Sequence, residues 1–293
     1  MKRLLLSLVA LSALFSCGEP APTVAPETVI TGTITNPDGN TVWIENYKNE
    51  KIKIDTLNEK GEFEIKFTLA EATCFEIVNG KAKSYLCLAP ADTLTASFDA
   101  KNICQTIVYS GKSIALNNYL AEKQRSCDKL MTGEYDSLYH MTPDTFLMTA
   151  EVLFKTFFSP FDAIKADTSV NKTLIAKEEE ALKYEKAALL LDYNYYHKMM
   201  RAIDSVPDIH KITDLTKDVN PNNASALDLK AYQNFLMSYI NFKAEEVYKA
   251  DTTLHSNPDG MNKAKLISVE KNITDPVVKE YLNNELKETS PTM

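Results

Sequence analysis

Apolar and polar residues alternate in short segments through the first third of the chain. The clearest segment is 62–67, where every second residue is apolar, as in a strand with one buried face. Residues 51–55 alternate in the same way, and 58–61 between them predicts a hairpin loop. The predicted strands are 29–35, 41–45, 51–55, 62–67, 74–78, 84–88, 94–98 and 105–109. This pattern favours an antiparallel β-sandwich over residues 28–110, with a β-barrel as the alternative.

Beyond residue 111 the spacing of apolar residues becomes that of helices, and glycine nearly disappears. Thr142 and Asp275 are each followed by proline, which predicts two helix starts with proline at the first helical position. We expect the first of these helices to end before Pro160, because a proline inside a helix removes a hydrogen bond. Other segments with helical spacing are 113–130, 174–203 and 229–242. The sequence therefore predicts an α+β chain, in which an all-α helical domain over 111–293 follows the β-sandwich.

The N-terminus carries an export signal. Lys2 and Arg3 precede an apolar stretch over residues 4–15, which is shorter than the roughly 20 residues that a membrane-spanning helix needs. The following Ser16-Cys17 completes a sequence that resembles a bacterial lipobox. We therefore predict a lipoprotein signal peptide over 1–16, lipidation of Cys17 and a proline-rich tether over 17–27. These features predict a soluble body in the cell envelope, anchored by lipid to the outer membrane or to the periplasmic face of the inner membrane.

The charge balance argues against one class of function. The 293 residues include 40 acidic and 32 basic side chains, which gives a net charge of −8. A surface that neutralises phosphates needs an excess of bases, so nucleic acid is not expected as a partner. The contiguous charges at 177–180 are expected to face solvent on a helix.

Four cysteines are left once Cys17 carries lipid, and two of them bracket a predicted hairpin. If its loop is at 80–81, Cys74 faces Cys87 and a disulfide is within reach. If the loop is at 79–80, Cys74 faces Tyr85 instead. An oxidising compartment favours the disulfide, and two small buried hydrophobic side chains are the alternative.

No reaction centre is visible in the sequence. No cysteine pair has the C-x-x-C spacing of thioredoxin-type redox centres, and the four histidines are too dispersed for an H-x-x-x-H metal site. The chain also lacks G-x-S-x-G, a phosphate-binding glycine loop and H-E-x-x-H. His197 ends a tyrosine-rich segment that is typical of a helix core with an amphipathic rim. We therefore predict no catalytic, cofactor-binding or metal-binding residue and no cofactor.

Several segments together resemble a known family. They are KIKIDTLNEKGEFEIKF, LCLAPADTLTASF and YSGKSIALNNYL, followed by LDLKAYQNFLMSYI and ITDPVVKEYLNNEL. After a lipobox, this order resembles the N-terminal portion of envelope-anchored thioredoxin-like (TlpA-like) thiol–disulfide lipoproteins, over nearly all of residues 17–288. The resemblance implies that a thioredoxin domain would begin at about the point where this sequence stops. Its catalytic C-x-x-C has no counterpart here, so the resemblance does not carry the activity with it.

We therefore predict a non-catalytic, lipid-anchored accessory or interaction module. Its partners would be the membrane, through the lipid, and a separate thioredoxin-like protein or a second copy of the chain. One alternative is a small-ligand or glycan-binding lipoprotein, suggested by the 14 tyrosines and requiring a concave, aromatic-lined pocket. The other is a thiol oxidoreductase without C-x-x-C, which would use Cys74 with Cys87 or Cys104 with Cys127 and requires an exposed reactive thiol.

Overall fold

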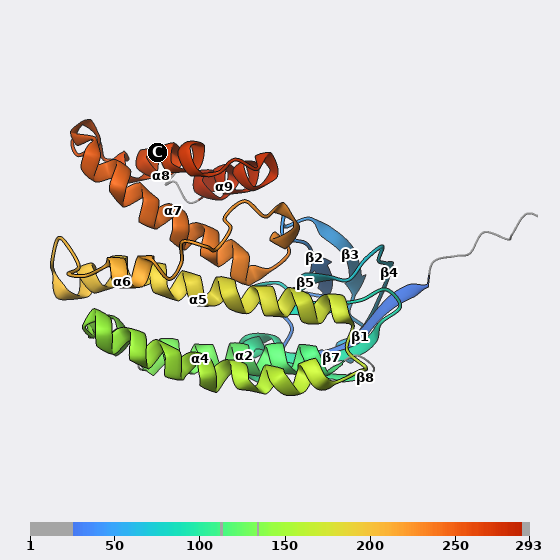
Figure 1. Ribbon diagram of the computed structural model, residues 1–293. Coiled ribbons are helices and arrows are strands. Elements are labelled where there is room, and N and C mark those ends of the chain that lie inside the picture. The colour runs from blue at the N-terminus through green and yellow to red at the C-terminus, as the bar shows by residue number, and fades with distance from the viewer. Residues whose placement is uncertain (1–25, 112–113, 134, 289–293) are drawn as a thin grey trace, which may run out of the picture.

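The computed structural model describes residues 26–111, 114–133 and 135–288. The predicted signal peptide, Cys17 and the tether up to residue 25 lie outside the described residues. The protein is α+β, which confirms the predicted fold class: two four-stranded sheets are followed by a helical region (Figure 1). None of the helices in the described ranges combines the length and the hydrophobicity that a membrane crossing requires.

The strands of the described chain form two open sheets. One sheet has the order β4-β1-β7-β8 and the other has the order β3-β2-β5-β6, so the barrel alternative is wrong. The strands are β1 (Glu27–Thr35), β2 (Thr41–Glu45), β3 (Lys51–Thr56), β4 (Glu62–Thr68), β5 (Thr73–Asn79), β6 (Ala82–Leu88), β7 (Thr93–Asp99) and β8 (Val108–Gly111). The last strand begins later than predicted, because one helical turn, α1 (Ile103–Thr106), takes up part of 105–109.

The first hydrophobic core lies between the two sheets. Alternate residues of each strand point into it, and Ile30, Ile44, Ile65 and Ile77 are fully buried there. The alternation that predicted these strands is therefore the pattern of burial. It also leaves the other face of the second sheet available for the helices.

The sandwich is not antiparallel throughout. β1 pairs with β4 in antiparallel orientation but with β7 in parallel orientation, with Ile30 opposite Leu94. Alternation shows which face of a strand is buried, and it carries no information about the direction of the neighbouring strand. For this reason the sequence predicted the strands and missed the one parallel pair among the described strands.

The predicted hairpin loop at 58–61 is a crossover between the sheets. β3 pairs with β2, whereas β4 pairs with β1. The Asn58 Oδ1 atom accepts hydrogen bonds from the backbone N–H groups of Lys60 and Glu62, at 2.9 and 3.0 Å, which closes the turn locally. As an edge strand, β3 leaves Ile52 and Ile54 exposed by 42% and 49%, although their alternation predicts a buried face.

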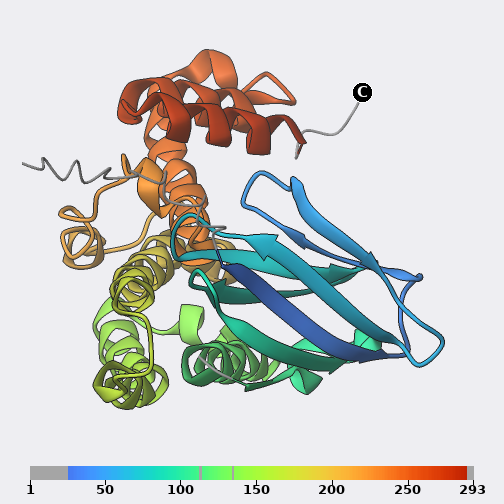
Figure 2. The same ribbon diagram turned by 90° about the vertical axis from the view of Figure 1, so that its right-hand side faces the viewer.

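The helices cover the outer face of the second sheet and extend beyond it (Figure 2). After α1 they are α2 (Ile114–Gly133), α3 (Tyr135–His140), α4 (Pro143–Ala166), α5 (Lys172–Arg201), α6 (His210–Thr213), α7 (Lys230–Ala250), α8 (Gly260–Asn272) and α9 (Pro276–Glu288). The predicted cap of α9 is confirmed, since the Asp275 Oδ1 atom accepts from the N–H groups of Val277 and Val278. The sequence pattern predicted none of α3, α6 and α8.

Helix α4 continues through Pro160, where the sequence predicted its end. Interior proline costs about 3 kcal/mol in a helix. Here the turn after it carries Phe161, which is 3% exposed and packs its ring against Tyr119 of α2, with ring centroids 5.5 Å apart. Burial of this side chain offsets a large part of that cost, since a buried phenylalanine contributes about 1.5–3 kcal/mol.

Two consecutive asparagines of α2 bind the edge strands of both sheets. The Asn117 side chain accepts from Cys87 N–H at 2.8 Å and donates to Cys87 C=O at 2.9 Å on β6. Asn118 makes the same pair of bonds with the backbone of Tyr109 on β8, each 3.0 Å long. Backbone groups at a sheet edge need such partners when a helix covers them. The segment ALNNYL therefore fixes α2 against the sandwich.

The hairpin β5–β6 has its loop at Gly80-Lys81, so Cys74 is opposite Cys87 and their sulfur atoms form a disulfide. Gly80 has a positive φ of 57°, and a Cβ atom there would lie 2.3 Å from the Asp38 side chain. Asp38 also accepts a hydrogen bond from Lys81 N–H at 2.9 Å. These contacts hold the loop in the register that brings the cysteines together.

We expect the disulfide to be present in the isolated protein. In denaturant without reductant, iodoacetamide should modify Cys104 and Cys127 but neither Cys74 nor Cys87, and after reduction it should modify all four. Mass spectrometry of the peptides measures this directly. The bond closes a loop with a sequence separation of 13, and its removal should lower the free energy of unfolding by about 2–3 kcal/mol. Modification of all four thiols before reduction would contradict the pairing.

Candidate functional site

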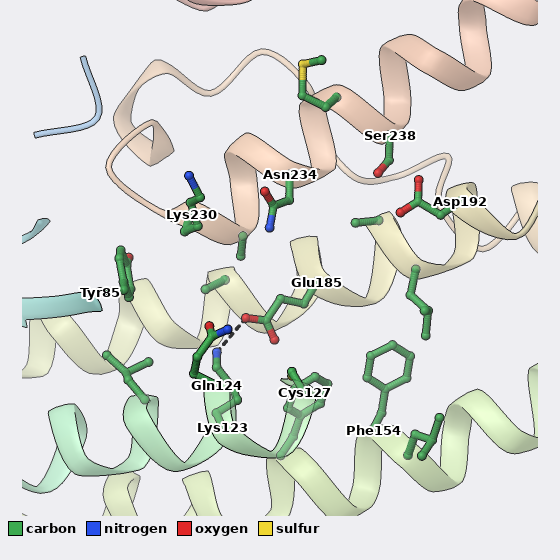
Figure 3. A pocket seen from close by; sticks show the side chains of 18 of the residues that line it. Tyr85, Lys123, Gln124, Cys127, Phe154, Glu185, Asp192, Lys230, Asn234 and Ser238 are labelled. Atoms are coloured by element: carbon green, nitrogen blue, oxygen red, sulfur yellow. Dashed lines mark hydrogen bonds and ion pairs between the residues drawn. The ribbon is translucent and has the colours of Figure 1, made fainter. Parts of the chain in front are cut away.

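A cleft of about 880 Å³ lies among the helices and reaches the second sheet at one end (Figure 3). Its walls come from β5, β6, α1, α2, α3, α4, α5 and α7. The apolar part of the lining includes Leu120, Leu153, Phe154, Phe158, Leu189 and Met237. Charged and amide side chains enter the cleft at a few positions, of which those of Lys123, Asp192 and Asn234 are labelled in the figure.

Lys123 of α2 is held between two glutamates of α5. Its Nζ atom lies 2.7 Å from a carboxylate oxygen of Glu178 and 2.7 Å from one of Glu185. The lysine side chain is 10% exposed, and the side chains of Glu178 and Glu185 are 5% and 29% exposed. Two residues seven positions apart on a helix share one face, which explains how both glutamates reach the same cation.

Burial and ion pairing act in opposite directions on this cluster. Burial alone would lower the pKa of Lys123, but the two facing carboxylates hold it above its usual value. Burial raises the pKa of Glu178, and the attraction of Lys123 only partly opposes this. Lys123 is therefore charged, and its charge is already neutralised by the protein.

A second polar group lies farther along the cleft. Asp192 of α5 faces Ser238 of α7 (Figure 3). Burial raises the pKa of Asp192 to about 6, and a hydrogen bond with Ser238 opposes the shift. Asn241 follows Ser238 by three residues on α7 and also lines the cleft, so the two lie on neighbouring positions of one helix face.

The end of the cleft next to the sheet is bordered by charged residues. Lys83 of β6 forms ion pairs with Glu45 and Glu76, and Lys230 at the start of α7 lies 3.9 Å from Glu76. The Tyr85 hydroxyl donates a hydrogen bond to the backbone carbonyl of Asp228 at 3.3 Å. This end thus carries bases and acids that pair with one another.

The four cysteines that the structure describes lie in two different settings. Cys74 and Cys87 are 2% and 5% exposed and pack against the helices in the second hydrophobic core. Cys104 and Cys127 are partly exposed, do not form a disulfide and line the cleft. Cys17 lies outside the described residues. The disulfide is therefore part of the packing between sheet and helices and does not line the cleft.

The prediction that residues 177–180 face solvent is wrong for most of them. Lys177 is paired with Asp228, with a shortest distance of 2.9 Å, and Glu178 is buried against Lys123. Glu180 accepts hydrogen bonds from Tyr184 and Asn223. Of the four residues, Glu179 alone forms an exposed ion pair, with Lys165. A charged run points in all directions around a helix, so its members meet different neighbours.

Apart from Cys104 and Cys127, the residues that line the cleft were not predicted as site residues. Lys123, Asp192 and Asn241 belong to three different helices, α2, α5 and α7, so no short sequence motif contains them together. Lone acids within otherwise apolar stretches, such as Asp192 after 187–191, are the one signal that could have found them. His197 was placed correctly in the core: it is 5% exposed and its Nδ1 atom lies 2.6 Å from the Tyr139 carbonyl oxygen.

No group of His, Cys, Asp and Glu residues in the described ranges is arranged to hold a metal ion. Comparison of the chain with models of protein families, with curated proteins and with solved structures gives no match.

Proposed function

We propose that this protein is a non-catalytic, lipid-anchored accessory protein of the cell envelope whose cleft binds a small amphipathic ligand. The observation that carries the proposal is the cleft itself, with its volume of about 880 Å³ and its largely apolar lining. Sites for small molecules commonly enclose about 300–1,000 Å³ and combine apolar walls with a few polar groups. The lipid anchor that the sequence predicts at Cys17 would keep the cleft near the membrane surface.

The position of the disulfide argues against thiol exchange at Cys74 and Cys87. Exchange requires that a thiolate reach one of the two sulfur atoms. Cys74 and Cys87 are 2% and 5% exposed, beneath the helices. A partner thiol would have to displace that packing before it could react, and this favours a structural role for the pair.

The proposal is tested with N-phenyl-1-naphthylamine, a neutral apolar probe that fluoresces when it leaves water. We expect saturable binding with one site per chain. Leu153→Trp places a large ring in the cleft, from α4, and should weaken binding at least about tenfold by filling the space that the probe needs.

The matched control is Val152→Trp, one residue earlier on the same helix. Val152 is 63% exposed and does not line the cleft, so this variant should bind the probe like the unchanged protein. Absence of saturable binding, or equal binding by the two tryptophan variants, would contradict the proposed function.

A further inference from the structure

We propose that the ligand of the cleft is a primary amine with an apolar body, and that its ammonium group binds between Asp192 of α5 and Asn241 of α7. This inference rests on the proposed function and adds the chemical class of the ligand. Its basis is a pair of hydrogen-bond acceptors on one wall of the cleft whose bonding capacity the described residues leave unused.

Asp192 is the first acceptor. It lies toward the cleft among largely apolar neighbours, and Figure 3 shows its carboxylate directed at Ser238. The causes that shift its pKa are burial and the hydrogen bond with Ser238, and no cation from the described part of the chain contributes. A carboxylate has room for about four hydrogen bonds, so one hydroxyl leaves most of its capacity free.

Asn241 is the second acceptor. Its Oδ1 atom is buried and has no hydrogen-bond partner among the residues that the structure describes. A buried carbonyl oxygen without a donor costs about 1–3 kcal/mol. Asn241 lies one helical turn after Ser238, the residue that Asp192 faces, so both acceptors belong to the α5–α7 side of the cleft.

The remaining charges of the cleft make a cation the complementary partner at this end. The positive charge of Lys123 is taken up by Glu178 and Glu185, and it is not available to Asp192. Lys83 and Lys230 belong to the end next to the sheet, where Glu76 and Glu45 face them. At this end of the cleft, the Asp192 carboxylate therefore presents a negative charge to a bound ligand.

Geometry and chemistry together select a primary ammonium. It carries one positive charge for Asp192 and three N–H donors, enough to serve both the carboxylate and the Asn241 oxygen. Phe154 of α4 points into the cleft (Figure 3), where its ring would contact the apolar body of the ligand. Leu153 and Met237 would contact the apolar body of the ligand.

Displacement of N-phenyl-1-naphthylamine from the full mature chain tests the inference. The competitors are octylammonium, octyltrimethylammonium and octanoate, each below its micelle concentration, and 1-octanol below its solubility limit. We expect octylammonium to compete at least about tenfold more tightly than 1-octanol, the value of one charge-assisted hydrogen bond. Octyltrimethylammonium, which has no N–H donor, should be weaker than octylammonium, and octanoate should be the weakest.

Asp192→Asn should bring octylammonium and 1-octanol to within about twofold of each other while the neutral probe still binds. The control is Asp162→Asn, which changes an exposed acid of α4 outside the cleft and should keep the tenfold preference. Equal competition by the amine and the alcohol in the unchanged protein, or an intact preference in Asp192→Asn, would overturn the amine assignment while the proposed function stands. Failure of the probe to bind at all would overturn both.

Discussion

Lys123→Met is expected to lower the free energy of unfolding by about 3–5 kcal/mol, one of the two largest effects that we predict for a single substitution. The lysine is the cation between Glu178 and Glu185, at 2.7 Å from each, and its side chain is 10% exposed. Without it, two carboxylates face each other in a partly apolar cleft. Urea unfolding followed by circular dichroism measures the change, with the slope of the transition as a check on two-state behaviour.

Two further variants separate the charge effect from the loss of side-chain packing. Glu178→Gln should cost less than about 1 kcal/mol, because burial already disfavours the charged form of Glu178 and Lys123 keeps its contact with Glu185. Lys165→Met removes an exposed pair with Glu179, both side chains being more than 40% exposed, and should change stability by at most about 1 kcal/mol. A loss in Lys123→Met no larger than in Lys165→Met would show that the buried pair does not stabilise the fold.

The local pattern of the sequence was sufficient to predict most strands and helices. Strict alternation at 62–67 predicted β4, and Asp275-Pro276 predicted the start of α9 together with its cap. What the pattern could not supply is which strands are neighbours. The parallel pairing of β1 with β7 joins residues more than sixty positions apart, and direction leaves no trace in alternation. The predicted helix end before Pro160 was wrong for a related reason. Phe161 is buried against Tyr119 of α2, and the sequence around Pro160 does not show that contact.

The cleft was beyond the reach of sequence patterns because its residues meet only through tertiary packing. The charges at 177–180 illustrate this: by composition they are a solvated run, yet Glu178 is buried and Lys177 reaches Asp228, 51 residues away. The disulfide was within reach because it is local. A two-residue loop fixes which residues are opposite each other. The sequence left open the choice between two loop positions and the choice between a disulfide and two small buried hydrophobic side chains.

Asp228→Ala is expected to lower the free energy of unfolding by about 3 kcal/mol, because it leaves three donors without their acceptor. The Asp228 carboxylate accepts from the Thr73 hydroxyl at 2.7 Å, from Cys74 N–H at 3.1 Å and from Lys177 Nζ at 2.9 Å. Its side chain is 11% exposed, and that of Lys177 is 21% exposed, so water replaces these bonds only in part. The same carboxylate therefore joins β5 of the sandwich to α5 and to the start of α7.

Asp228→Asn distinguishes the charge from the hydrogen bonds. The amide oxygen still accepts from Thr73 and Cys74, while the attraction to Lys177 is lost, so we expect a loss of about 1–2 kcal/mol, between those of the alanine variant and the unchanged protein. Asp218→Ala removes an exposed acid from the segment that precedes α7 and should stay within about 0.5 kcal/mol. Chemical denaturation of the three variants measures the order. If Asp228→Ala behaves like Asp218→Ala, the Asp228 carboxylate does not contribute to the attachment of the helices to the sandwich.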